Sequence, residues 1–221
     1  MATTIRAIIT GVTGMVGEGV LHECLLSPQV EAVLVINRKP CGIVHPKLKE
    51  IIHADFYDFS PIENQLSGYN ACFFCLGVSS IGMKEPDYYK VTYTLTLHVA
   101  QTLCKLNPDM TFCYVSGGST DTTEKGKVMW ARVKGKTENY LLAMPFKAAY
   151  MFRPGYIQPT EGLENTLKAY TYIGWMYPFL KKIMPSHVCT LRELGSAMIH
   201  TVTKGYPNHI LHSKDIVALS K

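Results

Sequence analysis

The feature that most constrains the fold is a glycine-rich turn near the amino terminus. Gly11, Gly14 and Gly17 follow an apolar run, residues 5–10, and open a segment with helical spacing, residues 15–26. Gly11 permits a tight turn, Gly14 lets the backbone approach a pyrophosphate, and Gly17 lets helix and strand pack closely. The helix N-terminus offers free N–H groups and the positive end of its dipole to a phosphate. This strand–turn–helix unit predicts a dinucleotide-binding site, with Thr13, Met15 and Val16 in the same turn.

The rest of the chain continues the alternation of apolar runs and helical segments. Continuous apolar strands separated by helices predict a parallel sheet covered on both faces, and right-handed crossovers make it doubly wound. We therefore expect an α/β Rossmann sheet in one domain, residues 1–221, with residues 158–221 forming a small lid on the substrate side. The expected strands cover residues 5–10, 32–36, 48–53, 72–76, 111–115 and 148–152, and the expected helices residues 15–26, 87–106 and 128–142.

Composition narrows the class of protein. The net charge of +5 comes without a dense Lys/Arg run, so nucleic acid is not an expected partner. We expect no signal peptide and no membrane-spanning segment, because no stretch of roughly 20 mainly apolar residues occurs. Seven scattered cysteines indicate reduced thiols and a cytoplasmic location.

Two short cysteine and histidine patterns are interpreted as structural. Cys72 and Cys75 fall on an expected strand, where residues three apart point to opposite faces, so their thiols should not meet. His209 and His212 have no carboxylate or third histidine close by in sequence, so no metal site is predicted.

The end of the second expected strand bears on cofactor choice. A site for NAD usually carries an Asp or Glu there, whereas this chain has Asn37, Arg38 and Lys39. A guanidinium attracts the 2′-phosphate that a carboxylate would repel, so the residues favour NADP, with NAD as the alternative. The other interpretation is that Arg38 and Lys39 are solvated loop charges. After the third and fourth strands, Asp55-Phe56 is expected at the adenine and Leu76-Gly77 beside the cofactor.

These motifs resemble the short-chain dehydrogenase/reductase superfamily, in its extended and atypical branch. The sequence looks most like small NADP-binding members described as epimerase-like or as Tat-interacting-protein-like oxidoreductases. The resemblance runs from residue 5 to about residue 158. The matching residues are Gly11, Gly14, Gly17, Arg38, Asp55-Phe56, Leu76-Gly77, Tyr114-Val115-Ser116-Gly117, Val133-Lys134-Gly135-Lys136-Thr137-Glu138 and Phe152-Arg153-Pro154-Gly155.

The resemblance implies a catalytic Ser, Tyr and Lys, with the Tyr four residues before the Lys. Lys134 matches the Lys, which in the family binds the nicotinamide ribose and lowers the pKa of the Tyr. Trp130 stands where the Tyr is expected. An indole N–H donates a hydrogen bond but does not give up its proton, so Trp130 cannot be the general acid. Either another residue supplies the proton, or the chain has lost the reductase step.

Candidates for the other roles follow from the same resemblance. Pro154 and Gly155 belong to the segment that passes beside the nicotinamide in the family, and Tyr156 comes next. Tyr156 is therefore a candidate acid, although packing is the alternative interpretation, as it is for Tyr88 and Tyr89. Ser116 is expected to be the family Ser, and the alignment leaves Ser119 and Thr120 as alternatives.

Three functions follow, from different classes. The first is an NADP-binding oxidoreductase or epimerase-like enzyme that acts on a small, apolar or aromatic molecule. The second is an NADP-sensing regulatory protein with little catalysis, and a membrane-peripheral protein is a weaker third. The aromatic segment 167–184 fits a lid, a partner surface or an interfacial helix. A homodimer is possible, because helices after strands four and five pair in many dimeric relatives.

Overall fold

The computed structural model describes residues 4–165 and 177–221 of the chain. In this part, one sheet contains seven parallel strands in the order β3-β2-β1-β4-β5-β6-β9. The strand order reverses beside β1, as it does in a doubly wound fold. The predicted Rossmann sheet is confirmed. The strands are β1 (Ile5–Thr10), β2 (Val30–Asn37), β3 (Leu48–Ile52), β4 (Ala71–Phe74), β5 (Thr111–Val115), β6 (Ala148–Arg153) and β9 (Ile210–His212).

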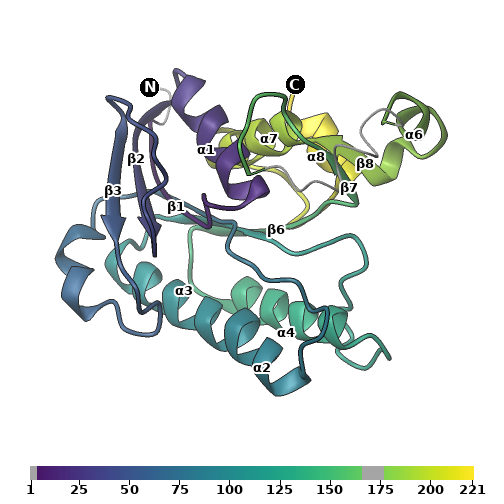
Figure 1. Ribbon diagram of the computed structural model, residues 1–221, viewed down its shortest axis with the longest axis horizontal. Coiled ribbons are helices and arrows are strands. Elements are labelled where there is room, and N and C mark those ends of the chain that lie inside the picture. Colours follow the sequence, from purple (N-terminus) through teal and green to yellow (C-terminus); the bar gives the residue numbers. More distant parts are fainter. Residues whose placement is uncertain (1–3, 166–176) are drawn as a thin grey trace.

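Helices cover both faces of the sheet (Figure 1). One layer contains α1 (Met15–Leu26), α7 (Leu191–Thr203) and α8 (Ser213–Leu219). The opposite layer contains α2 (Glu85–Tyr89), α3 (Leu95–Leu106) and α4 (Met129–Ala143). The single helix expected over residues 87–106 is helical throughout, but a π-helical turn, η2 (Lys90–Thr94), joins α2 to α3. A 3-10 helix, η1 (Ser60–Gln65), precedes β4.

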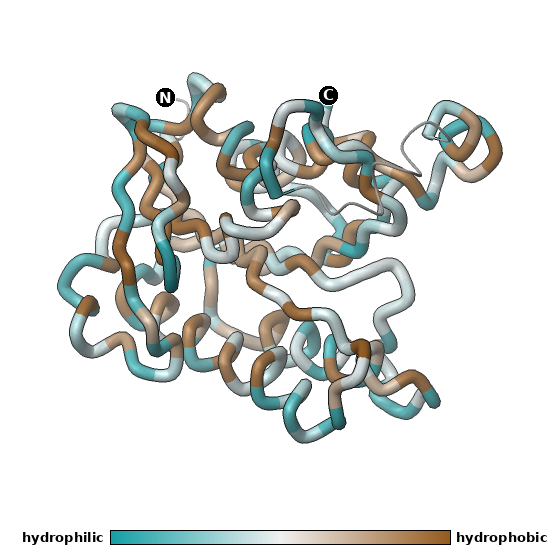
Figure 2. Tube along the Cα trace, in the orientation of Figure 1, coloured by the Kyte–Doolittle hydropathy of each residue, from teal (hydrophilic) through white to brown (hydrophobic). Residues whose placement is uncertain are grey.

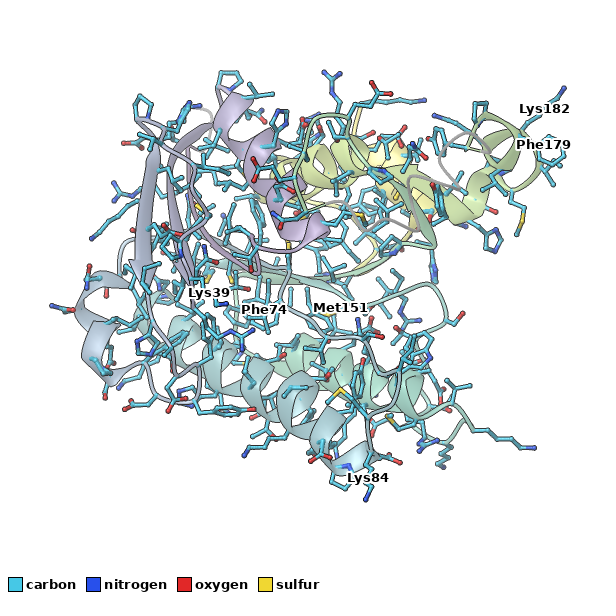
Figure 3. All side chains as sticks on the ribbon, viewed as in Figure 1. Lys39, Phe74, Lys84, Met151, Phe179 and Lys182 are labelled. Atoms are coloured by element: carbon cyan, nitrogen blue, oxygen red, sulfur yellow. The ribbon has the colours of Figure 1, made fainter. Side chains whose placement is uncertain are left out.

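The sheet is apolar on both sides, as its sequence predicts. Phe73 packs into the hydrophobic cluster under α1 and α7, while Phe74, its neighbour, packs into the cluster under α3. Figure 2 shows hydrophobic residues recurring along the strands between the two helical layers. Phe74 and Met151 lie on the side of the sheet that faces α3 and α4 (Figure 3). Burial on both faces explains why the strands are continuous apolar runs.

The carboxyl-terminal tail differs from the expectation of a lid over residues 158–221. Strand β9 pairs with β6 and extends the main sheet, and α7 packs against α1. Among the described residues of the tail, the shorter pieces β7 (Tyr156–Gln158), α6 (Tyr177–Ile183), η4 (Pro185–His187) and β8 (Val188–Thr190) lie outside this frame. Strand β9 has only three residues, and α7 lies in the part of the chain where the alternation of strands and helices weakens, so the sequence does not predict that either extends the frame of the sheet.

The aromatic segment 167–184 is only partly described, since residues 166–176 lie outside the described ranges. Its described part, α6, stands at the periphery, where Phe179 and Lys182 project away from the sheet (Figure 3). The Phe179 side chain is 61 % exposed. None of the helices in the described ranges is long and apolar enough to span a membrane.

The cysteines are free thiols. Cys72 and Cys75 pack on opposite faces of the sheet, as the strand period predicts. His209 donates a hydrogen bond from Nδ1 to the Ala149 carbonyl oxygen (2.7 Å) and stacks on Tyr150. Among the described residues, no group of three or more His, Cys, Asp or Glu side chains is placed to hold a metal ion.

Candidate functional site

A cavity of about 760 Å³ opens at the carboxyl ends of β1, β2 and β4, at the glycine-rich turn. Helix α1 begins at this cavity with Gly14 as its N-cap, and no side chain caps it. The first N–H groups of a helix have no partner within the helix, so this end is open to an anion. Of the residues expected at the cofactor, the cavity is lined by Gly11, Thr13, Gly14, Met15, Val16, Asn37, Arg38, Phe56, Leu76, Gly77, Lys134, Pro154 and Gly155.

Each glycine of the turn has a distinct steric role. Gly11 adopts a φ of 77°, which other residues rarely reach, and a Cβ there would lie 2.7 Å from backbone atoms of Cys75 and Leu76. A Cβ on Gly17 would lie 2.2 Å from the Gly11 carbonyl oxygen, so Gly17 supports packing and does not line the cavity. A Cβ on Gly14 would meet only that same oxygen, at 3.5 Å. The space beside Gly14 is therefore kept for a ligand, and the turn fits a dinucleotide pyrophosphate.

The far end of this cavity carries the residues expected at the adenosine ribose. The Asn37 amide nitrogen donates to the Glu50 carboxylate (2.7 Å), which also accepts the Cys41 N–H (2.9 Å). Arg38 lines the cavity, whereas Lys39 is exposed and does not. Asp55 also lies outside the lining, because its carboxylate accepts the Tyr57 N–H (2.8 Å) and shapes the turn that presents Phe56.

Lys134 lies where this cavity meets a second one. Its ammonium group donates to the Ser116 carbonyl oxygen (2.6 Å), which fixes the side chain at the end of β5. Burial lowers the pKa of Lys134 to about 8, and the charge of Glu138 offsets part of that lowering. A lysine with this pKa exchanges its proton near neutral pH.

A buried ionic network stands behind Lys134. The Ser116 hydroxyl donates to Glu138 (2.5 Å) and to the Phe152 carbonyl oxygen (3.2 Å). Glu138 also accepts two hydrogen bonds from Nε of Arg153 (3.1 Å each) and one from its Nη2. The Glu138 side chain is 0 % exposed and that of Arg153 8 %. Ser116 lines both cavities, and its hydroxyl contacts Glu138 and Phe152, so its role toward a substrate stays a prediction.

The second cavity, of about 890 Å³, lies between the end of β6, the loop after β4 and the start of α8. Trp130, Lys134 and Ser119 line it, as do residues of the tail. Tyr88 lines it with a side chain that is only 2 % exposed, and burial raises its pKa. Tyr156 lines neither cavity, and its hydroxyl donates to the Gln158 side chain (2.9 Å). Thr120 is buried beside this region, while Tyr89 contacts Tyr93 and Lys136.

The two cavities are continuous. Residues that follow β4, β5 and β6, together with one residue of α4, line both of them: Val78, Ser79, Ser116, Gly117, Pro154, Gly155 and Lys134. A dinucleotide whose pyrophosphate rests on α1 would therefore extend toward Lys134 and the second cavity. This is the arrangement that a nicotinamide-dependent reaction requires, with the reacting ring beside a substrate space.

Residues 7–129 match the NAD dependent epimerase/dehydratase family, which is more than half of the chain. The chain belongs to this family. The matched residues include the glycine-rich turn of the first cavity. The expected superfamily is confirmed.

Solved structures share the fold of this epimerase/dehydratase family member. The enzyme WbmF of Bordetella bronchiseptica, in complex with NAD+, has a TM-score of 0.69 at 15 % identity, over 99 % of this chain and 77 % of that one. A UDP-N-acetylglucosamine 4-epimerase from Methanobrevibacter ruminantium has a TM-score of 0.66 at 14 % identity, over 98 % and 81 % of the two chains. WbmF is also known in complexes with NAD+ and UDP and with NADH. The family that matches this chain is described as NAD dependent, and the preference for NADP stays a prediction.

Curated relatives correct the expected location. Protein FMP52, mitochondrial, of Debaryomyces hansenii is 25 % identical over 171 residues, which is 73 % of this chain and 72 % of the relative. Protein FMP52-2, mitochondrial, of Scheffersomyces stipitis is 25 % identical over 97 % of both chains. Their names contradict the cytoplasmic expectation, which is wrong. Free thiols indicate a reducing compartment and cannot single out the cytoplasm.

Sequence reasoning missed several residues of the site. Glu138 belongs to a matching motif and follows Lys134 by four residues on a helix, a spacing that places both on one face, yet it received no role. Arg153 likewise matched without being assigned. His187, His212 and Lys214 come from the tail; no motif marks His187 or Lys214, and the His209–His212 pattern is interpreted as structural. Only the fold brings them to the second cavity.

Proposed function

We propose that this family member is an NADP-dependent oxidoreductase that acts on a small molecule bound in the second cavity. The observation that carries the proposal is the position of Lys134, which lines both cavities and is fixed by its hydrogen bond to Ser116. A group there can contact a nicotinamide ribose and a substrate together. Arg38 supports NADP over NAD, because it is the cation of the expected set that lines the ribose end.

The chain's own residues bind, orient and handle the proton. The N-terminus of α1 and Gly14 hold the pyrophosphate, and Phe56 and Asn37 flank the adenosine. NADPH, when bound, supplies the hydride that a carbonyl carbon accepts. The carbonyl oxygen takes a proton, and we assign its source to the Lys134 ammonium, whose pKa of about 8 suits such a transfer. The balanced products are an alcohol and NADP+.

Trp130 has a separate part in this proposal. It lies one helical turn before Lys134 and lines the second cavity. Its indole can stack on the substrate or donate a hydrogen bond, but it cannot transfer a proton. The Glu138–Arg153 pair holds β5 and β6 in register with α4, so that Ser116 and Lys134 keep their geometry.

A second candidate function is an NADP-binding protein with little catalysis. The observation that favours it is the absence, among the described residues of the second cavity, of an exposed phenol beside Lys134. The names of the curated relatives support a mitochondrial location for either function.

The test measures NADPH oxidation with a panel of aldehydes and ketones, for wild type and for Trp130→Tyr. The proposal expects turnover by wild type, lost in Lys134→Met while NADPH still binds, although more weakly. Trp130→Tyr places a phenol next to Lys134 and should raise the rate. If neither protein oxidises NADPH with any carbonyl and both bind NADPH, the non-catalytic function replaces the first proposal.

A further inference from the structure

The charges around the second cavity are of one sign. Its lining contains no Asp or Glu from the described residues. Its positively charged or protonatable side chains come from four elements, α4, β6, η4 and the β9–α8 junction: Lys134, Arg153, His187, His212 and Lys214. A partly enclosed space with charge of one sign focuses the field on a ligand of the opposite sign.

Two of these cations already have partners. Arg153 is paired with Glu138 behind the cavity wall, and the Lys134 ammonium is bonded to the Ser116 carbonyl oxygen. Lys214 forms no ion pair among the described residues, and it is exposed at the first turn of α8. Nδ1 of His187 is hydrogen-bonded to the Ser186 hydroxyl (3.0 Å). The tail side of the cavity therefore offers the Lys214 ammonium group and the imidazole side chains of His187 and His212 to a ligand.

The nearest tail carboxylate is engaged elsewhere. Asp215 does not line the cavity. Its two oxygens accept the Tyr206 hydroxyl (3.2 Å) and the His212 backbone N–H (3.0 Å). It caps α8 and leaves the Lys214 charge uncompensated on the cavity side.

The opposite wall is apolar. It is built by Trp130, Tyr88, Val78 and Ile81, which come from α4, α2 and the loop after β4. Ile81 is 91 % exposed, so its apolar surface is accessible to a ligand at the rim of the cavity. A ligand that matches both walls has an apolar body and an acidic group at its far end.

We propose that the substrate of this site is an apolar or aromatic carbonyl compound, or the matching alcohol, that carries a carboxylate. Its carboxylate lies at Lys214, His187 and His212, its body lies on Trp130, and its reacting carbon lies beside Lys134. The inference rests on the proposed function, since it names the substrate class of the same cavity. Charge-assisted hydrogen bonds to a carboxylate are stronger than neutral ones, so the acid should bind more tightly than its ester.

The experiment compares 4-(hydroxymethyl)benzoate with its methyl ester, two alcohols that cannot form imines with lysines. Binding to the full-length protein is followed by calorimetry and by ligand-observed NMR, with and without NADP+. We expect the acid to bind roughly tenfold more tightly than the ester, the value of one charge-assisted contact. Lys214→Gln should remove most of this preference. Lys204→Gln is the matched control, because Lys204 is also exposed but lies outside the cavity.

The outcomes separate this inference from the proposed function. Equal binding of acid and ester, tighter binding of the ester, or an equal loss in Lys204→Gln overturns the inference. In that case, oxidation of NADPH with neutral aldehydes would leave the oxidoreductase proposal standing. Preferential binding of the acid by a protein that binds neither NADPH nor NADH would support an acid-binding cavity and refute the proposed function.

Discussion

Replacing Glu138 by glutamine tests the network that holds the site together. The carboxylate is 0 % exposed and accepts hydrogen bonds from Ser116 and from the Arg153 guanidinium, itself 8 % exposed. The substitution preserves the volume but removes the charge, and an amide NH2 group then faces two donors. Arg153 is left buried without a counter-charge.

The magnitude follows from burial. Removing one partner of a buried ion pair costs about 3–5 kcal/mol, because the remaining charge is desolvated and uncompensated. With a denaturant dependence of about 3 kcal/mol per molar urea for a chain of this size, the unfolding midpoint should fall by about 1–2 M. An exposed ion pair contributes only about 0–1 kcal/mol.

The assay is equilibrium urea unfolding, followed by circular dichroism. Glu85→Gln is the matched control, because Glu85 pairs with Arg132 at 2.7 Å but its side chain is 49 % exposed. We expect this control to shift the midpoint by less than about 0.3 M. The double variant Glu138→Gln/Arg153→Met removes both charges and should recover much of the loss.

The reasoning is refuted if Glu138→Gln and Glu85→Gln shift the midpoint equally. It is also refuted if Glu138→Gln/Arg153→Met is less stable than Glu138→Gln, because the two losses would then add as independent effects. Either result would mean that the buried pair does not connect α4 to the ends of β5 and β6.

Three further predictions concern the cofactor end of the site. Gly17→Ala should lower the melting temperature measured by circular dichroism, because the new Cβ would lie 2.2 Å from the Gly11 carbonyl oxygen, and an unchanged temperature would contradict the close packing. The pKa of Lys134 is about 8 in the folded chain against 10.5 ordinarily, so the folded state binds fewer protons between these values and stability should rise with pH across that window. Urea unfolding at several pH values should show this rise in wild type and a smaller one in Lys134→Met. Arg38→Gln should weaken NADPH binding roughly tenfold and leave NADH binding unchanged, as measured by calorimetry, and equal effects on both would remove Arg38 as the phosphate ligand.

The sequence predicts the nucleotide half of the fold well because its signals are local. Gly11, Gly14 and Gly17 lie at the junction of a strand and a helix. The steric reason for each glycine can be recognised from its position in this short motif. Continuous apolar strands in turn require cover on both faces. This is why a parallel, doubly wound sheet follows from the pattern.

The fold of the carboxyl-terminal tail could not be predicted from the sequence, because it depends on tertiary contacts. Strand β9 has three residues and exists only by pairing with β6. Lys214 and His187 reach the second cavity only through the packing of α8 and η4 beside Gly155, where a Cβ would lie 2.2 Å from the His187 carbonyl oxygen. No periodic pattern in the sequence predicts this packing of α8 and η4.

The buried ionic network could be predicted from the sequence only in part. Lys134 and Glu138 are one turn apart on α4, which sequence spacing predicts, but the partner Arg153 comes from β6. The register between a helix and a strand depends on the packing of the whole layer, so the pairing appears only in the structure. The hydrogen bond from Ser116 to Glu138 likewise appears only in the structure.

Calorimetric titration of the wild-type chain with NADPH and NADH tests the central claim most directly. The account predicts one NADPH bound per chain, tighter than NADH, and no detectable binding by Gly14→Val. That variant should fold, because a Cβ at Gly14 meets only one backbone oxygen at 3.5 Å, yet its side chain would fill the pyrophosphate space. A wild-type chain that binds neither cofactor, or a Gly14→Val variant that binds NADPH as well as wild type, would contradict it.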